Sequence, residues 1–167
     1  QYSYVQATNN AETGGLSLLL NPDGGTVTMP NQPAFNARVN QDTAYNTTGW
    51  NKVTIGTLMN QRGSHYNTST SRFTAPVSGW YHMSMSVVFN AGSDIDGAIS
   101  LGINGGVSNK GIGVNQAQNG GSFSGRSASG SVYMTAGDYA EVYVYITAAM
   151  TTRGSVYAGY FSGHLIG

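Results

Sequence analysis

Two long stretches of this chain alternate apolar and polar residues with a period of two. Apolar residues occupy every second position of residues 81–89 and again of residues 140–148. Successive side chains of a β-strand point to opposite faces, so this period predicts strands with one buried face. No window shows the three- and four-residue spacing of an amphipathic helix. With Gly at 24 of 167 positions, against a usual share of roughly 7%, the pattern predicts an all-β sandwich or barrel of antiparallel strands.

The alternation assigns a core face and an outer face to the strand that follows Gly79. The predicted core residues are Tyr81, Met83, Met85, Val87 and Phe89. On the opposite face, the small side chains of Ser84 and Ser86 would let another subunit approach closely. Farther along, the Gly-, Asn- and Ser-rich residues 104–131 are expected to form hairpin loops with one or two short strands.

In the strand of residues 139–147, the aliphatic set is the predicted core: Ala140, Val142, Val144, Ile146 and Ala148. The opposite face then carries a ladder of tyrosines, Tyr139, Tyr143 and Tyr145, together with Glu141 and Thr147. We expect the rings to pack across neighbouring strands. The alternative is a flat platform with hydroxyl tips that binds sugar rings or a partner protein.

The low charge of the chain excludes several classes of partner. Charged residues are 8% of the total, against roughly 25% in ordinary domains, and the formal net charge is zero. A surface with so few basic residues does not bind the phosphate backbone of a nucleic acid, and the chain has no polybasic segment that could bind anionic lipid. No apolar run is long enough to span a membrane. The sequence therefore predicts neither a nucleic-acid partner nor membrane insertion.

Catalytic and metal-binding chemistry is sparse. The chain has no cysteine, and we recognise no nucleophile–base pair. Asp94 and Asp96 are close in sequence, but in one loop they point the same way rather than across a sugar cleft. They could instead bind Ca²⁺ or contact a receptor, although no full EF-hand loop is present. Asp138, after Gly137, is predicted to cap a turn. We expect no enzyme activity, no metal and no cofactor.

Residues 1–32 differ from the remainder and are predicted to form a shaft or linker segment with a β-hairpin. Leu18-Leu19-Leu20 leads into the turn Asn21-Pro22-Asp23-Gly24-Gly25, and Thr26-Val27 follows. The sequence from Leu18 to Val27 resembles a repeat found ahead of the terminal domains of bacteriophage tail fibres and related adhesins. The alternative is an ordinary hairpin. Since no signal peptide precedes Gln1, we expect a mature or excised piece of a longer chain.

Aromatic residues recur at fixed offsets within residues 33–167: Phe73 lies seven residues after Tyr66, Gly79 six after Phe73, and Tyr81 two after Gly79. This spacing resembles that of the globular head of complement component C1q and of adiponectin. The opening Pro33-Ala34-Phe35, the middle Ala128-Ser129-Gly130 with Gly137-Asp138, and the closing Phe161-Ser162-Gly163 occur in the family's order. Met83 departs from the pattern, because a Phe is usual there.

The resemblance implies a jelly roll of two sheets, related to tumour necrosis factor, that assembles as a homotrimer. It implies that the last strand lines the threefold axis, so the expected trimer interface comprises Ser84, Ser86, Tyr160, Ser162, His164 and Ile166. Three copies of His164 would then converge, and we expect them to pack without a ligand; the alternative is a metal or a pH-sensitive contact. Some relatives carry calcium near the trimer apex, which gives Asp94 and Asp96 the alternative role of ligands.

Taken together, the sequence predicts the homotrimeric head of a bacteriophage fibre, exposed on the outside of the virion, that attaches to a glycan or protein of the host surface. The expected receptor-binding residues are Tyr139, Tyr143, Tyr145, Asp94 and Asp96. The N-terminal shaft would contact other virion proteins. Two alternatives remain: a purely structural decoration or collar protein of the virion, and a secreted complement-like or lectin-like protein.

Overall fold

The computed structural model describes residues 31–90, 97–107, 112–116, 123–155 and 158–167. The chain divides into two units, Gln1–Pro30 and Asn31–Gly167, and all described residues belong to the second unit. The hairpin expected within the first unit lies outside the described residues. The loop that carries Asp94 and Asp96 lies outside them as well.

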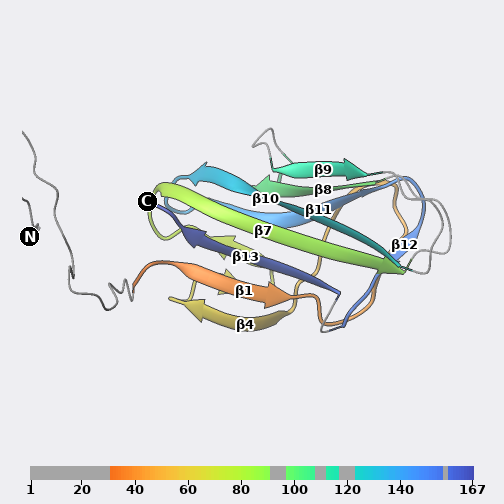
Figure 1. Cartoon of the computed structure of the whole chain (residues 1–167), viewed down its shortest axis with the longest axis horizontal. Helices are drawn as coiled ribbons and strands as arrows, with labels where there is room; N and C mark the ends of the chain where they lie inside the picture. Colours follow the sequence, from red (N-terminus) through yellow and green to blue (C-terminus); the bar gives the residue numbers. More distant parts are fainter. Residues whose placement is uncertain (1–30, 91–96, 108–111, 117–122, 156–157) are drawn as a thin grey trace, which may run out of the picture. The chain divides into compact units, whose positions relative to one another are not determined.

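The described residues form β-strands and no helix, which confirms the all-β fold class (Figure 1). The strands are β1 (Ala34–Arg38), β2 (Thr43–Tyr45), β3 (Gly49–Lys52), β4 (Thr57–Arg62), β5 (Tyr66–Asn67), β6 (Arg72–Thr74), β7 (Gly79–Asn90), β8 (Gly97–Ile103), β9 (Gly113–Gln116), β10 (Ser124–Met134), β11 (Tyr139–Ile146), β12 (Met150–Thr152) and β13 (Gly159–Leu165).

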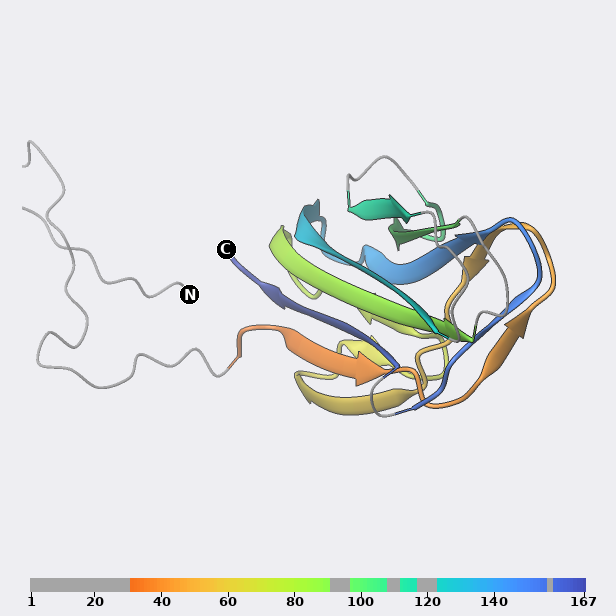
Figure 2. The same ribbon diagram turned by 45° about the vertical axis from the view of Figure 1, so that its right-hand side comes forward.

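The strands make two antiparallel sheets that form the two layers of the head (Figure 2). The first sheet has the order β2-β12-β7-β13-β1-β4, with β10 also paired to β7. The second sheet has the order β5-β6-β11-β8-β9, with β3 also paired to β11. Most neighbouring strands are far apart in sequence, as in β1 beside β13, so the first and last strands of the head lie together. The expected two-sheet sandwich is confirmed.

The core lies between the sheets and contains the residues that the alternation predicts. All five predicted core residues of β7 are no more than 1% exposed, and the four of β11 up to Ile146 are fully buried. Ala148 is an error of that prediction, because β11 ends at Ile146 and Ala148 is exposed. The period of two assigns faces only as far as the pairing with neighbouring strands continues.

The aromatic residues whose spacing suggested the family meet at one point in this core. The ring of Phe35 stacks on Tyr66 and Phe73, with centroids 5.0 and 4.6 Å apart, and meets Phe161 edge-on at 4.8 Å. Phe73 also contacts Tyr81 edge-on at 5.5 Å. Offset-stacked and edge-on pairs at these distances stabilise a core beyond the area they bury. The spacing along the chain therefore reflects one cluster built from β1, β5, β6, β7 and β13.

Strand β10 is longer than the sequence indicates. Residues 104–131 were expected to contain loops and short strands, yet β10 pairs with β7 at every position from Ser124 to Met134. Its inward positions include the small Ala128 and Gly130, and a Cβ at Gly130 would come 3.1 Å from Ile112. Neighbouring side chains such as Ile112 fill the space beside these small residues. The sequence of β10 therefore lacks an apolar residue at these inward positions and shows no clear alternation.

Asp138 caps a turn, as predicted. Its carboxylate accepts a 2.8 Å hydrogen bond from the backbone N–H of Thr135 and another of 2.8 Å from the side-chain amide of Asn104. Gly137, just before it, has a φ of +92°, a conformation that favours glycine. This turn fixes the point at which β11 begins.

Candidate functional site

The outer face of the first sheet carries rows of small polar residues, and we call it the serine face. The central row runs across four strands as Ser129, Ser84, Ser162 and Asn36. The rows on either side are Ser127, Ser86, Tyr160 and Arg38, and Ser131, His82, His164 and Ala34. Residues directly opposite each other on adjacent strands share a face, so these rows form one continuous surface.

The structure brings the residues expected at a trimer interface together on the serine face. Ser84 pairs with Ser162, and Ser86 with Tyr160, across β7 and β13. The hydroxyl groups of Ser84 and Tyr160 lie 3.2 Å apart. Ile166 follows the end of β13 and is 53% exposed. Within a single copy, this surface faces solvent.

His164 has a neighbour that the sequence analysis did not assign to it. It lies directly opposite His82, and the two imidazole rings are 5.7 Å apart between centroids, with their planes at 45°. Among the described residues, no group of three or more His, Asp or Glu could hold a metal ion. The two rings form a pair on the serine face, without a third ligand residue beside them among the described residues.

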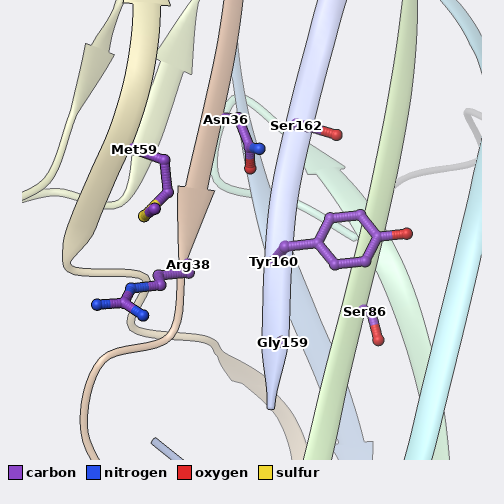
Figure 3. A pocket seen from close by; sticks show the side chains of 7 residues that line it. All are labelled: Asn36, Arg38, Met59, Ser86, Gly159, Tyr160 and Ser162. Atoms are coloured by element: carbon purple, nitrogen blue, oxygen red, sulfur yellow. The ribbon is translucent and has the colours of Figure 1, made fainter. Parts of the chain in front are cut away.

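A hollow of about 690 Å³ opens on the serine face beside Tyr160 (Figure 3). The Tyr160 ring lies on one side, over β7, while Arg38 and Met59 lie on the other. Met59 is the extra residue at a bulge between β1 and β4, which turns its side chain outward. The buried Nε of Arg38 has no hydrogen-bond partner among the described residues. An acceptor from another molecule could supply that partner.

Large apolar side chains are also exposed on the serine face. Trp80 and Tyr133 lie opposite each other on β7 and β10, 5.9 Å apart and edge-on, and are 53% and 48% exposed. Tyr160 and Met59 are 41% and 52% exposed. Apolar side chains grouped in this way mark surfaces that contact another molecule.

The outer face of the second sheet carries the predicted tyrosines, and we call it the tyrosine face. It comprises Tyr139, Glu141, Tyr143 and Tyr145 of β11 with Trp50, Lys52 and Arg72 of the strands beside it. Tyr145 meets Trp50 edge-on at 5.4 Å, and the guanidinium carbon of Arg72 lies 4.1 Å from the centre of the Tyr139 ring. A Cβ at Gly102 would come 2.5 Å from the Tyr143 ring, so that ring covers Gly102. Each ring thus packs on a neighbouring strand.

Glu141 is the centre of the tyrosine face. Its side chain is fully buried although it points away from the core, because Lys52, Arg72 and Tyr143 surround it. Lys52 and Arg72 both donate to Oε1, the latter at 2.7 Å, and the Tyr143 hydroxyl donates to Oε2 at 2.9 Å. One carboxylate thereby positions two cationic groups and a tyrosine.

The contacts around Glu141 shift three pKa values. Burial alone would raise the pKa of Glu141, but hydrogen bonds from Lys52, Arg72 and Tyr143 outweigh it and hold the pKa below its ordinary value. Burial, together with the hydrogen bond to Glu141, raises the pKa of Tyr143 to about 12. The bond to Glu141 also raises the pKa of Arg72. At neutral pH the cluster therefore contains two cations, one carboxylate and a neutral phenol.

A second hollow, of about 300 Å³, lies beside Trp50 next to the tyrosine face. Its lining residues are Trp50, Ala98, Ile99, Ser100, Ile112, Gly113 and Val114. Ser100 lies opposite Tyr143 on β8, and Trp50 is two residues from Lys52 on β3, so the hollow adjoins the charged cluster. It combines an exposed indole with a hydroxyl group.

The cationic half of this arrangement could not be predicted from the sequence. Lys52 and Arg72 lie 89 and 69 residues before Glu141, and only the strand register brings them to it. Glu141 was the one signal in the sequence. A carboxylate within a ladder of tyrosines becomes buried, and a buried carboxylate needs a cation nearby. The predicted receptor contacts Asp94 and Asp96 lie outside the described residues. No helix of the described part is long and apolar enough to cross a membrane.

The fold and its two outer faces define a class: an all-β, two-sheet head that presents surfaces for other molecules. The family model of the C1q domain matches residues 34–166, and the chain belongs to that family. Among solved structures, the globular domain of zebrafish complement 1qA protein is 16% identical, with a TM-score of 0.52, over 81% of this chain and 98% of that one. Murine APRIL at pH 5.0 is 12% identical, with a TM-score of 0.58, over 81% and 99%. No curated protein matches.

The solved structures carry the fold alone, because their identities to this chain are low. They support the jelly roll that the resemblance implied, and the family model extends it over almost the whole of the described unit. The complement and adiponectin resemblance is thereby confirmed at the level of the family.

Proposed function

We propose that this chain is the trimeric head of a bacteriophage tail fibre or virion fibre and attaches to a glycan or protein of the host surface. The head has no enzymatic activity and needs no cofactor. The observation that carries the proposal is the serine face, because its residues suit close contact with further copies. The tyrosine face remains outward and is available to a receptor.

The serine face supports a trimer on physical grounds. Rows of serine across β10, β7 and β13 permit close approach of a second backbone, and the exposed Trp80, Tyr133 and Tyr160 would bury apolar area in the same contact. The unpartnered Nε of Arg38 would find an acceptor there. When different patches of identical subunits meet and each subunit is rotated by a third of a turn from the last, the contacts close into a ring of three.

Placement on a virion rests on the first 32 residues and on the composition. The Asn21-Pro22-Asp23-Gly24-Gly25 phrase resembles tail-fibre repeats, and residues 1–32 would join the head to the shaft and to other virion proteins. The absence of cysteine and the 8% of charged residues suit a particle that meets variable redox and ionic conditions outside the cell.

Attachment by such a head works through multiplicity. Three tyrosine faces per fibre and several fibres per particle raise the effective concentration of each site, so a weak single contact suffices. Tyr139, Tyr143 and Tyr145 are the proposed receptor contacts within the described residues. Asp94 and Asp96 are proposed to add loop contacts, with a calcium ion there as the alternative.

Labelled trimer added to a panel of bacterial strains tests this proposal. We expect binding to the host strain and competition with adsorption of the intact phage. A head that binds no strain and does not slow adsorption contradicts attachment and favours a decoration or collar protein. Collagen-like Gly-X-Y repeats ahead of Gln1 would instead favour the secreted complement-like or lectin-like alternative.

A further inference from the structure

The tyrosine face has more positive charge than its own carboxylate neutralises. Lys52 and Arg72 keep 34% and 38% of their side chains exposed, whereas Glu141 is fully buried. Two cations face one carboxylate, so the cluster has one positive charge in excess. Asp138, just before β11, accepts hydrogen bonds from Asn104 and from the Thr135 N–H.

The cationic groups retain hydrogen-bond donors toward solvent. Arg72 has five N–H donors and Lys52 has three. Glu141 is the only hydrogen-bond acceptor of either side chain among the described residues. Because both groups bond the same oxygen of Glu141, their remaining donors lie close together. A second carboxylate placed outside them would accept charge-assisted hydrogen bonds from both.

The hollow beside Trp50 adds an apolar surface at a defined distance from the cation of Lys52. Trp50 and Lys52 lie two residues apart on one face of β3, which separates them by roughly 7 Å along the strand. Trp50 is 44% exposed, and the hollow of about 300 Å³ also presents the hydroxyl of Ser100. One side of a sugar ring consists of C–H groups and stacks on an indole, while its rim of hydroxyls bonds polar side chains. A single sugar ring suits a hollow of this size.

We infer that the tyrosine face binds a carbohydrate that carries a carboxylate. Its carboxylate accepts hydrogen bonds from Arg72 and Lys52, and the sugar ring packs against Trp50. Glu141 is a positioning residue, since it holds both cations without touching the ligand. This inference rests on the proposed attachment function and names the chemistry of the receptor.

The charge and shape favour an acidic sugar over other anions. An excess of one positive charge matches one carboxylate per sugar unit and is too small to hold a densely charged polyanion. An acidic peptide would use the cations equally well but would leave the indole and the adjoining hollow without a matching group. The sugar therefore uses all three elements of the surface.

Calorimetric titration of the purified chain tests the inference with matched probes. The acidic probes are oligosaccharides containing glucuronate, galacturonate or N-acetylneuraminate; each is compared with its carboxyl-reduced, neutral counterpart and with hexaglutamate peptide. We expect at least one acidic probe to bind about ten- to hundredfold more tightly than its neutral counterpart. No binding to any acidic probe, equal binding of the neutral counterparts, or binding of the peptide alone would overturn the inference.

Variants assign the binding to the tyrosine face. Arg72→Gln and Lys52→Gln should each weaken the acidic probe about tenfold or more and leave the neutral probe unchanged, whereas Trp50→Ala should weaken both. Arg153→Gln is the control for lost charge, because Arg153 follows β12 and packs on Phe123 instead. An equal loss in all variants, or no loss in Arg72→Gln, would refute the site.

Cell binding separates this inference from the proposed function. If the head binds host cells and Arg72→Gln binds them equally well, the acidic-sugar site is wrong and attachment stands. If the head binds an acidic probe through Arg72 but no host cell, the site stands and attachment is wrong.

Discussion

The Nε atom of Arg72 donates a 2.7 Å hydrogen bond to Glu141, a carboxylate that points out of the second sheet and is nonetheless fully buried. Lys52 bonds the same oxygen from another strand. Three strands, β3, β6 and β11, are thereby tied together on their outer side. The bond links the stability of the head to the geometry of the surface that we propose binds the receptor.

Replacing Glu141 should destabilise the head moderately. Glu141→Gln keeps the size of the side chain but removes its charge, and we expect a loss of about 1–2 kcal/mol in the free energy of unfolding at pH 7. This is less than for a fully buried pair, because Lys52 and Arg72 stay partly hydrated. Urea unfolding measures it. In a double-mutant cycle with Arg72→Gln, the two effects should not add; additive effects would contradict the pairing.

The lowered pKa of Glu141 predicts a defined pH dependence. Between the folded-state pKa and the ordinary value of 4.5, the unfolded chain binds more protons than the folded one, so stability falls as pH falls. The contribution is complete above about pH 5 and is lost as pH falls through the folded-state pKa. The stability difference between the wild type and Glu141→Gln should therefore shrink from pH 7 to pH 3. A constant difference would show that the Glu141 charge does not stabilise the fold.

Gly102 is required because the Tyr143 ring lies on it. A Cβ there would sit 2.5 and 2.7 Å from Cε2 and Cδ2 of Tyr143, so Gly102→Ala must displace the ring and weaken its bond to Glu141. We expect a loss of about 1–3 kcal/mol, seen as a lower urea midpoint. Gly125→Ala is the control: its Cβ meets only Val88, at 3.8 Å, so that variant should be neutral or slightly more stable. Equal effects would contradict the packing.

The strands that carry an apolar alternation could be predicted from the sequence. In β7 and β11, one face is core and the other is not, so each side chain reveals its direction. The turn at Asp138 could also be predicted, because the sequence Gly137-Asp138 is a local turn signal. The sequence marked Phe35, Tyr66, Phe73 and Phe161 as residues that carry the family resemblance, but it did not show that their rings meet in one cluster.

The features that depend on strand register could not be predicted. The eleven residues of β10 carry mostly Ser, Gly and Ala, so its length follows from pairing with β7 rather than from its own pattern. The burial of Glu141 requires Lys52 and Arg72, which arrive on strands distant in sequence. The same holds for the pairing of His82 with His164. A one-residue slip would move each of these side chains to the other face.

The serine face predicts a variant that separates assembly from folding. Ser162→Arg places a long cation in the central row of the serine face, between the uncharged side chains of Ser84 and Asn36. Burying an unpaired charge costs several kcal/mol, so we expect the trimer to dissociate while the far-UV circular dichroism of the head stays unchanged. Thr54→Arg, at an exposed position between β3 and β4, is the matched control and should remain trimeric. Trimeric Ser162→Arg would place the interface elsewhere.

The mass of the chain in solution, by sedimentation equilibrium over a range of micromolar concentrations, tests the account most directly. A trimer joined through the serine face predicts three times the chain mass of 17.5 kDa, independent of dilution within that range. A stable species of 17.5 kDa at every concentration would mean that the serine face meets water, and it would contradict the proposed assembly.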